Sequence, residues 1–541
     1  MQSSSGSACV RPPCSLSARM QGALVNRIGR ISLLLAITLA SILVHGYHMG
    51  TDDAAIYAPG IEKAADPSLF PFGSEFFMHH AGLSLFPRLV ASITWLTGLP
   101  IEWSMLLWFA FAQFLLLWSA YELAGQCFRS ERARWAGVGL LAALLSVPVA
   151  GTALIIADSY LTARSLSTPL VLMAVACFLA KRTRSACLWL LCAFLIHPQM
   201  AIYGAGFGLM LAFQPLSREP VGVGGAAPVL PAWLILPIFI QEHLQIQEHL
   251  QPAQGAYREV VASRAYFLVT TWRWWEWVGA LAPLIILAVW AKLSLPATLP
   301  AFSRLARTLI GLGLISTLAA FLLASNIDFS YLLRLQPMRS FHLIYVVFFL
   351  LLGGVLGEYL LRSHVWRWIL CFSALSGGMF VLDVATYPAS PHIERPGVRY
   401  QGEWLSSFLW IRDHTPKDAV FALDPDYLSK SGVDLHGFRA IAERSALADQ
   451  EKDSGAASVF PELAERWKRQ SAAQFDWAHV SEARLRDLHA QYGVSWVLLE
   501  NPAALGGVVC PYRNGGLRVC RIVDEQGQFL GRASIANCSR K

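Results

Sequence analysis

Charged side chains are scarce in this sequence. Asp, Glu, Lys and Arg make up only 15% of its 541 residues, whereas soluble domains carry roughly 25%. Hydrophobic residues account for 55% of the chain, and the mean hydropathy is +0.45. A chain this long and this apolar is predicted to be an α-helical polytopic membrane protein.

The common motifs of nucleotide and zinc chemistry are also missing. The sequence has no P-loop, no GxGxxG run ahead of a helix, no Ser-His-Asp signature and no HExxH, so nucleotide hydrolysis and zinc proteolysis receive no support. None of its ten cysteines forms a pair with convincing zinc-ligand spacing. The net charge of +7 is modest and is typical of basic cytoplasmic loops, so we expect no nucleic-acid partner.

Long apolar segments follow one another through the first 390 residues or so. Basic clusters such as Arg129–Arg134 and Lys181–Arg184 fall between alternate pairs of these segments. The positive-inside rule then places the N-terminus in the cytoplasm and the C-terminal tail outside. We predict about 9–11 spans, of which nine are assigned, at 29–46, 102–124, 135–157, 167–180, 186–212, 277–292, 305–325, 338–360 and 368–386.

The segments around these spans differ in character. Residues 1–28 are predicted to be a disordered leader, because they are Ser-rich and lack periodicity. Residues 29–392 form the transmembrane domain, with a long first outer loop at 47–101. Within that loop, 83–99 is expected to be interfacial or re-entrant. The segment 186–212 is broken by His197-Pro198, so it is either one kinked helix or two half-helices.

The composition changes near Ile393. Residues 393–541 carry ordinary charge density and no long apolar run, and they are predicted to be a soluble periplasmic α/β domain. Cys510 and Cys520 flank a predicted hairpin; a disulfide is permitted in the periplasm, whereas two unpaired thiols are expected if the topology is inverted. The predicted elements are a helix at 402–413, strands at 418–424 and 494–499, and the hairpin of 505–510 and 517–523.

An acidic pair, Asp52 and Asp53, directly follows the first apolar segment. Ionisable groups this close to a bilayer are costly, so we expect the pair to mark function. A carboxylate here could take a proton from an acceptor hydroxyl or bind a divalent metal such as Mg²⁺ or Mn²⁺. Arginines in the other outer loops would hold a phosphate bidentately. The candidate substrate-binding residues are Glu75, His79, Asp158, Arg164, His197, Asp328, Arg334 and Arg339.

Simpler roles stay open for several of these residues. Asp52 is well placed to cap a helix that begins at Ala54. The arginines could be interfacial residues whose charged ends reach water, and His197-Pro198 could be only a kink. In the tail, one stretch is expected to be a solvated helix face that carries Arg439, Arg444, Asp449 and Asp453.

Three short stretches carry a resemblance to a known family. They are Thr51-Asp-Asp-Ala-Ala-Ile-Tyr with the acidic pair, Asp158-Ser-Tyr-Leu-Thr-Ala-Arg, and Gln336-Pro-Met-Arg-Ser-Phe. Together with the long first outer loop, the many short spans and the outer C-terminal domain, they resemble the GT-C superfamily of integral-membrane glycosyltransferases, in particular its uncharacterised bacterial members. The resemblance in layout covers residues 29 to about 525.

The resemblance implies a function and a location. GT-C enzymes transfer a sugar from a polyprenyl-phosphate-linked donor to an acceptor on the extracytoplasmic face. It implies that Asp52 or Asp53 is the base or metal ligand, and that Arg334 or Arg339 holds the lipid phosphate. It further implies a multi-pass protein of the bacterial inner membrane whose partners are the lipid-linked donor and membrane lipids. The alternatives are a non-catalytic transporter, flippase or polysaccharide-export protein, whose carboxylates form an ion or proton site, and a scaffold whose outer domain binds a partner.

Overall fold

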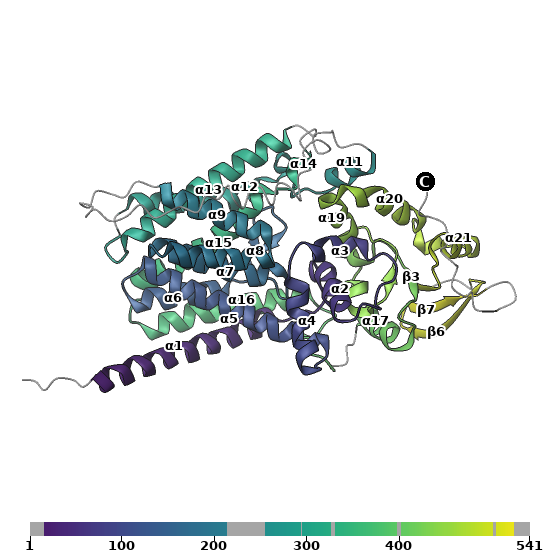
Figure 1. Cartoon of the computed structure of the whole chain (residues 1–541), viewed down its shortest axis with the longest axis horizontal. Coiled ribbons are helices and arrows are strands. Elements are labelled where there is room, and N and C mark those ends of the chain that lie inside the picture. Colours follow the sequence, from purple (N-terminus) through teal and green to yellow (C-terminus); the bar gives the residue numbers. More distant parts are fainter. Residues whose placement is uncertain are drawn as a thin grey trace, which may run out of the picture.

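The two ends of the molecule differ in structure (Figure 1). One end consists of long apolar helices and is called the helical half below. The other end, called the C-terminal domain, holds a sheet and shorter helices. The chain is therefore an α-helical polytopic membrane protein with a small C-terminal α/β domain, as predicted. The computed structural model describes residues 16–213, 255–293, 295–325, 330–397, 402–500, 505–523 and 528.

Six helices in the described residues are long and apolar enough to cross a membrane. The predicted segment 186–212 is two helices, because Pro198 lacks an amide proton and begins a new helix after the extended His197. The six are Arg27–His45 of α1 (Leu16–His45), α5 (Ile101–Cys127), α12 (Trp274–Lys292), α13 (Pro300–Ala324), Pro337–Leu361 around α15 (Phe341–Leu356), and α16 (Val365–Thr386). Three shorter apolar helices lie among them: α7 (Ala163–Leu179), α8 (Thr183–Ile196) and α9 (Pro198–Phe213).

The predicted span at 135–157 is wrong in its second half, which is not helical. Its first part is α6 (Glu131–Ala143), which is 13 residues long and ends level with the end of α1, where the His45 ring lies 3.0 Å from the Ala142 carbonyl oxygen. The chain then turns at Gly151, whose φ of +61° cannot continue an α-helix. Hydropathy alone did not reveal this break. The residues after α6 form a hairpin of β1 (Pro148–Val149) and β2 (Leu154–Ile155).

Close helix packing in the helical half depends on glycine. An added Cβ on Gly353 of α15 would lie 2.6 Å from the Ala136 carbonyl oxygen of α6, and one on Gly137 would lie 2.7 Å from the Leu350 carbonyl oxygen. Small residues of this kind allow two membrane helices to approach backbone to backbone.

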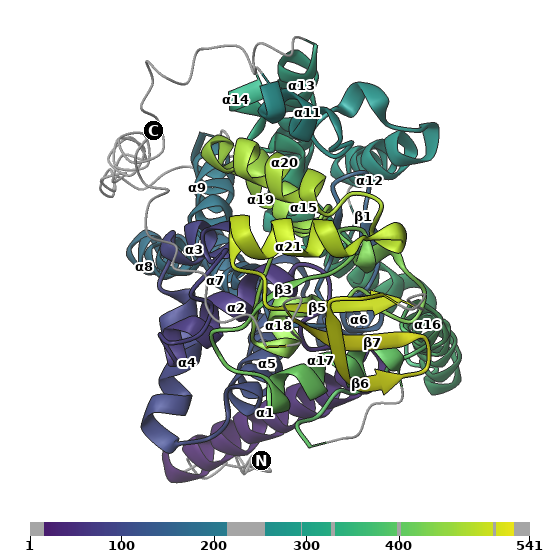
Figure 2. The same ribbon diagram turned by 90° about the vertical axis from the view of Figure 1, so that its right-hand side faces the viewer.

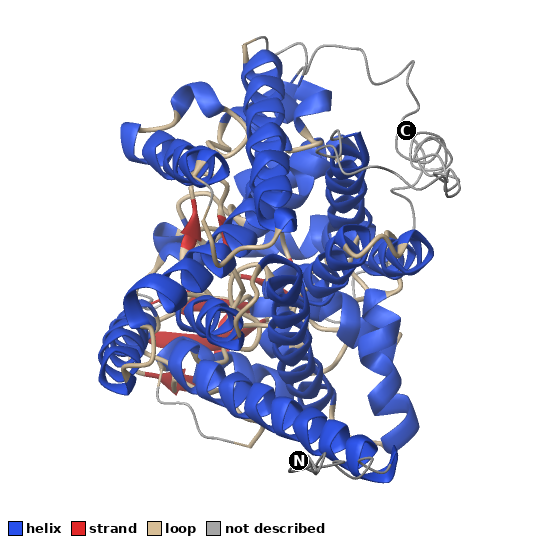
Figure 3. Ribbon diagram, turned by 90° about the vertical axis from the view of Figure 1, so that its left-hand side faces the viewer, coloured by secondary structure: helices blue, strands red, loops and turns tan. Residues whose placement is uncertain are grey.

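Seen from the helical end, helices fill the front of the molecule and the larger sheet lies behind them (Figure 3).

Three short helices lie between the helical half and the C-terminal domain (Figure 1). The predicted interfacial piece at 83–99 is one of them, a 12-residue helix that is too short to span a bilayer. Another packs tightly against the C-terminal domain, since a Cβ on Gly437 would lie 2.3 Å from the Ala55 Cβ. The three helices are α2 (Ala54–Ala65), α3 (Glu75–Gly82) and α4 (Phe86–Thr97).

The C-terminal domain is built on a five-stranded sheet of order β4-β3-β5-β7-β6 (Figure 2). The β4, β3 and β5 strands are parallel, while β5, β7 and β6 are antiparallel. The predicted strands and hairpin are present, and a disulfide joins Cys510 to Cys520. The strands are β3 (Val420–Ala422), β4 (Ser445–Ala446), β5 (Trp496–Glu500), β6 (Val508–Asn514) and β7 (Leu517–Ile522).

Both faces of the central strand β5 are covered. Trp496 and Leu498 pack in the cluster that contains α17 (Glu403–His414). Val497 and Leu499 point the other way, into the cluster that contains α21 (Glu482–Tyr492). This two-sided burial explains why the strand reads as a continuous apolar run in the sequence.

The predicted solvated helix face in the C-terminal domain is also wrong. Its four charged residues, Arg439, Arg444, Asp449 and Asp453, are each at most 8% exposed. The stretch is not one helix, because α18 (Phe438–Ala442) and α19 (Lys452–Val459) are separated by β4.

Two further helices are α11 (Gly255–Ala262) and α20 (Ala464–Ala473), which pack against α19, and α14 (Ser330–Leu333) precedes α15.

Candidate active site

The acidic pair lies in the short connection between α1 and α2. Main-chain hydrogen bonds hold this connection on two sides: the His48 amide donates to the Ser159 carbonyl (2.8 Å), and the Asp52 amide donates to the Leu435 carbonyl (3.0 Å). Asp52 has a φ of 49°, which a non-glycine residue keeps only where its surroundings hold it. Both the helical half and the C-terminal domain therefore position the pair.

Neither aspartate caps α2. Asp53 occupies the N-cap position, but its side chain accepts no hydrogen bond from the first turn. Asp52 Oδ2 instead accepts a hydrogen bond of 3.0 Å from the Tyr160 hydroxyl, and its Oδ1 forms an ion pair with Lys452. The capping role that the sequence left open is therefore wrong.

Lys452 is a site residue that the sequence analysis missed. It begins α19 in the C-terminal domain and is only 8% exposed. Its Nζ contacts Asp52 and lies 3.6 Å from Asp53 Oδ1. Burial alone would lower the pKa of Lys452, but the two aspartate charges outweigh it and raise that pKa. No local pattern signals this contact, because 400 positions separate Lys452 from Asp52.

Arg164 brings a second cation to the pair from the first turn of α7. Its Nη2 donates to both Asp158 oxygens, at 2.8 and 2.7 Å, and lies 3.9 Å from Asp53 Oδ2. The Thr162 hydroxyl, which caps α7, also donates to Asp158 (3.1 Å). Burial raises the pKa of Asp158 against the opposing charge of Arg164. Two predicted site residues thus reach the acidic pair as a joined ion pair.

Arg339 supplies a third cation, from the segment that leads into α15. Its guanidinium lies over the Tyr266 ring at 5.5 Å, and its buried Nε has no hydrogen-bond partner among the described residues. Burial alone would raise the pKa of Asp53, but the charges of Lys452, Arg164 and Arg339 outweigh it and lower that pKa. Asp53 is therefore ionised at neutral pH.

Neutral hydrogen-bonding groups adjoin these charges. The rings of Tyr57 on α2 and His80 on α3 meet edge to face at 6.3 Å. Burial lowers the pKa of His80 to about 4 and raises that of Tyr57 to about 12, so neither is charged at neutral pH. His197, at the break between α8 and α9, lies within reach of the charges of Arg164 and Arg339.

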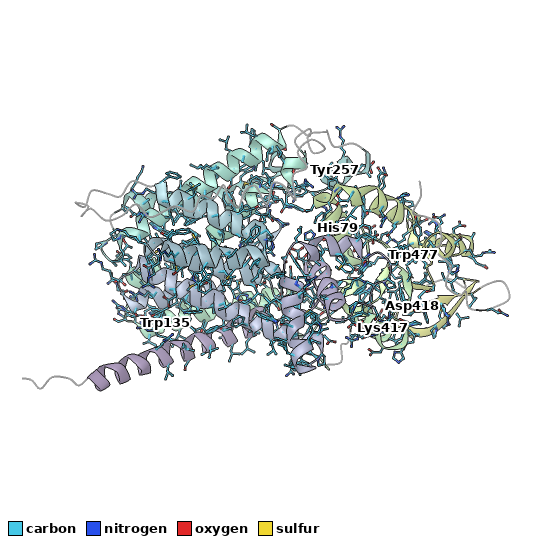
Figure 4. The ribbon with its side chains drawn as sticks, in the orientation of Figure 1. His79, Trp135, Tyr257, Lys417, Asp418 and Trp477 are labelled. Carbon is cyan, nitrogen blue, oxygen red and sulfur yellow. A yellow bond between two sulfur atoms is a disulfide. The ribbon has the colours of Figure 1, made fainter. Side chains whose placement is uncertain are left out.

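Three other predicted residues turn away from the acidic pair. Arg334 Nη1 donates to the Val459 carbonyl at 3.1 Å. The remaining two pair with the C-terminal domain: Glu75 lies 2.6 Å from Arg466, and His79 lies 3.5 Å from Glu462. Figure 4 shows His79 at the boundary between the two halves, with Trp135 in the helical half and Trp477 in the C-terminal domain. Asp328 lies outside the described residues.

A small pocket adjoins the Asp158–Arg164 pair, and both residues line it. Three of its lining side chains, Gln113, Thr168 and His342, each carry a buried polar atom without a hydrogen-bond partner among the described residues. Buried polar atoms of this kind are normally satisfied. Water or a hydroxyl group of a ligand would satisfy them.

The donor set does not suit a divalent metal. No group of three or more His, Cys, Asp or Glu side chains in the described part of the chain is arranged to hold one. Asp52 and Asp53 are faced by Lys452, and Asp158 is held by Arg164. A cation adjacent to each carboxylate repels a metal ion and competes for the same oxygens.

Fold and site together define a polytopic membrane protein with a charged centre built by its first loop, its membrane helices and its C-terminal domain. No protein-family model and no curated protein matches the chain. Among solved structures, it is similar to the archaeal oligosaccharyltransferase AglB from Archaeoglobus fulgidus in complex with an inhibitory peptide and a dolichol-phosphate (10% identity, TM-score 0.40, 88% of this chain and 70% of that chain). It is also similar to ArnT from Cupriavidus metallidurans bound to undecaprenyl phosphate (12% identity, TM-score 0.36, 92% of this chain and 98% of that chain).

Both TM-scores lie below 0.5, so the likeness carries no argument about the chemistry of this chain. The chemistry of this chain follows from the site itself.

Proposed function

We propose that this chain is a glycosyltransferase that transfers a sugar from a polyprenyl-phosphate-linked donor to an acceptor hydroxyl. One observation carries the proposal: the ionised Asp53 lies 3.6 Å from Lys452 and 3.9 Å from Arg164, and the charge of Arg339 also lowers its pKa. A carboxylate next to a cluster of cations suits a reaction in which one substrate loses a proton while the other loses an anionic group.

Asp53 is the better candidate for the base. Its carboxylate accepts no hydrogen bond from the described residues and is 28% exposed. Both oxygens of Asp52 are already engaged, by Lys452 and by Tyr160. Asp53 would take the acceptor's hydroxyl proton as the oxygen bonds to the anomeric carbon. The bond from that carbon to the lipid phosphate oxygen breaks at the same time, and the phosphate leaves with the electron pair.

Arg339 is the candidate for holding that phosphate. Its Nε has no partner in the described part of the chain, whereas Arg164 is committed to Asp158. An arginine donates to phosphate oxygens in a fixed, planar geometry. The neutral groups of His80, His197 and Tyr57 would then contact uncharged hydroxyls.

We also propose that the protein lies in the bacterial inner membrane, with its N-terminus in the cytoplasm and its C-terminal domain in the periplasm. The basic clusters between spans support this orientation. The disulfide between Cys510 and Cys520 is compatible with an oxidising compartment. The reaction would then take place on the extracytoplasmic face.

The test measures release of polyprenyl phosphate from radiolabelled polyprenyl-phosphate sugars by the purified protein in lipid nanodiscs, with a set of acceptors. Release is scored because the same polyprenyl phosphate leaves the donor whichever acceptor receives the sugar. We expect Asp53→Asn to lose about 10²–10⁴-fold in rate and Asp52→Asn to lose less. Glu75→Gln is the matched control, because Glu75 is a carboxylate of the same loop that faces Arg466 instead.

Wild-type rates in both aspartate variants would refute the proposed base. A transporter or flippase would bind the same donor and leave it intact. In transporters, coupling carboxylates lie near bilayer mid-depth in broken helices, whereas Asp52 and Asp53 follow the end of α1.

A further inference from the structure

Lys452 occupies the place between the two aspartates where a bridging cation would sit. Its Nζ contacts Asp52 Oδ1 and lies 3.6 Å from Asp53 Oδ1. A Mg²⁺ or Mn²⁺ ion that bridged these oxygens would need to approach each to about 2.1 Å. The ion and the ammonium group therefore cannot occupy the site together.

The fold holds this lysine in place from the C-terminal side. Asp449 Oδ1 accepts hydrogen bonds from the amides of Glu451 (2.9 Å) and Lys452 (2.5 Å), which fixes the start of α19. One residue further on, Asp453 is locked to Arg439 at 2.8 Å, and both of these side chains are buried. The lysine side chain is therefore anchored at its base by a rigid turn.

The three carboxylates and three cations around the centre balance one another. Lys452 pairs with both members of the acidic pair, and Arg164 pairs with Asp158 and Asp53. The charge of Arg339 acts on Asp53 as well. Removing the single charge of Lys452 would leave the acidic pair with excess negative charge. A metal ion would then be attracted to oxygens that Lys452 now covers.

We infer that Lys452 is a built-in counter-ion that takes the place of a divalent metal at Asp52 and Asp53, so that the wild-type site excludes Mg²⁺ and Mn²⁺. Lys452 acts through the aspartates and is a positioning residue. The metal-binding test below stands independently of the proposed function, and only the activity test rests on it.

The test is a Mn²⁺ titration of the purified full-length protein, followed by electron paramagnetic resonance. We expect wild type and Lys452→Arg to show no binding that depends on Asp53. Lys452→Met should bind Mn²⁺ at least about tenfold more tightly than wild type does. Adding Asp53→Asn to this variant should abolish that binding. Lys417→Met is the matched control. Lys417 forms an ion pair of 2.7 Å with Asp66, and neither residue belongs to this site.

Two results would overturn the inference. The first is Mn²⁺ binding by wild type that disappears in Asp53→Asn. The second is a folded Lys452→Met variant that binds no Mn²⁺. Should Lys452→Met fail to fold, wild type and Lys452→Arg decide the matter, since Asp53-dependent binding in either contradicts the inference and its absence in both supports it.

A separate assay measures polyprenyl phosphate release with and without EDTA. Unchanged release in EDTA supports the inference, and release that requires added Mg²⁺ contradicts it. If no donor is cleaved under any condition, the proposed function fails while the Mn²⁺ result still stands.

Discussion

His48 and Glu394 form a buried ion pair, with His48 Nδ1 3.1 Å from Glu394 Oε1. His48 follows the end of α1, and Glu394 follows the end of α16. The same Glu394 oxygen lies 2.9 Å from His436 of the C-terminal domain, and His48 Nε2 lies 3.3 Å from Asp383 of α16. This network ties two membrane helices to the C-terminal domain four residues before the acidic pair begins.

Replacing His48 is expected to destabilise the whole junction. His48→Gln leaves the buried carboxylates of Glu394 and Asp383 short of a partner, and we expect a loss of about 3 kcal/mol in unfolding free energy. Thermal unfolding in detergent measures the effect. His479→Gln is the control, because His479 pairs with Asp476 on the surface and its side chain is 81% exposed. An equal melting temperature for both variants would contradict the prediction.

The same network predicts a pH dependence of stability. Burial alone would lower the pKa of His48, but Asp383 and Glu394 outweigh it and raise that pKa to about 9, from 6.5 in the unfolded chain. The resulting stabilisation is complete below pH 6.5 and is lost as the pH rises through 9. Melting temperatures measured from pH 6 to 10 should fall over this window in wild type. The slope should be smaller in His48→Gln.

We expect a Gly→Ala substitution to change the free energy of unfolding differently at two positions. Gly353→Ala would place a Cβ 2.6 Å from the Ala136 carbonyl oxygen, and we expect a loss of about 1–3 kcal/mol from overpacking between α6 and α15. Gly377 in α16 has open space around its Cβ position, so Gly377→Ala should be neutral or stabilising. Thermal unfolding of both variants checks this. Similar losses for both would show that the close helix contact is not the cause.

The disulfide tests the proposed location of the C-terminal domain. With the domain in the periplasm, Cys510 and Cys520 should react with a maleimide reagent only after reduction. Gel-shift labelling of freshly prepared membranes measures this, with the Cys510→Ser/Cys520→Ser variant as the reference for labelling of the eight other cysteines. Labelling of both thiols without reductant would place the domain in the cytoplasm.

Several features of the fold could be predicted from the sequence because local patterns set them. Apolar length marks the spans, and two-sided burial makes β5 a continuous apolar run. The break at His197-Pro198 follows from the missing amide proton of proline. One failure has a physical cause: the helix predicted over 135–157 ends at Ala143, and the apolar residues beyond it form a hairpin that turns at Gly151.

The candidate site could be predicted only in part. Asp52, Asp53, Asp158 and Arg164 stand out because charge is rare beside apolar segments. Glu75, His79 and Arg334 stand out for the same reason, yet they bind the C-terminal domain instead. Scarcity of charge marks the boundary between membrane and water, and it does not tell which boundary residues converge.

By itself, the sequence determined that this is a polytopic membrane protein with an acidic pair after its first span and a C-terminal α/β domain, since hydropathy and periodicity are local properties of the chain. Tertiary structure alone decided that Lys452 meets this pair. That contact is made across 400 positions by the docking of α19, and no short-range pattern encodes it. The charged stretch around Lys452 reads as a solvated surface until folding buries it against Asp52 and Asp53.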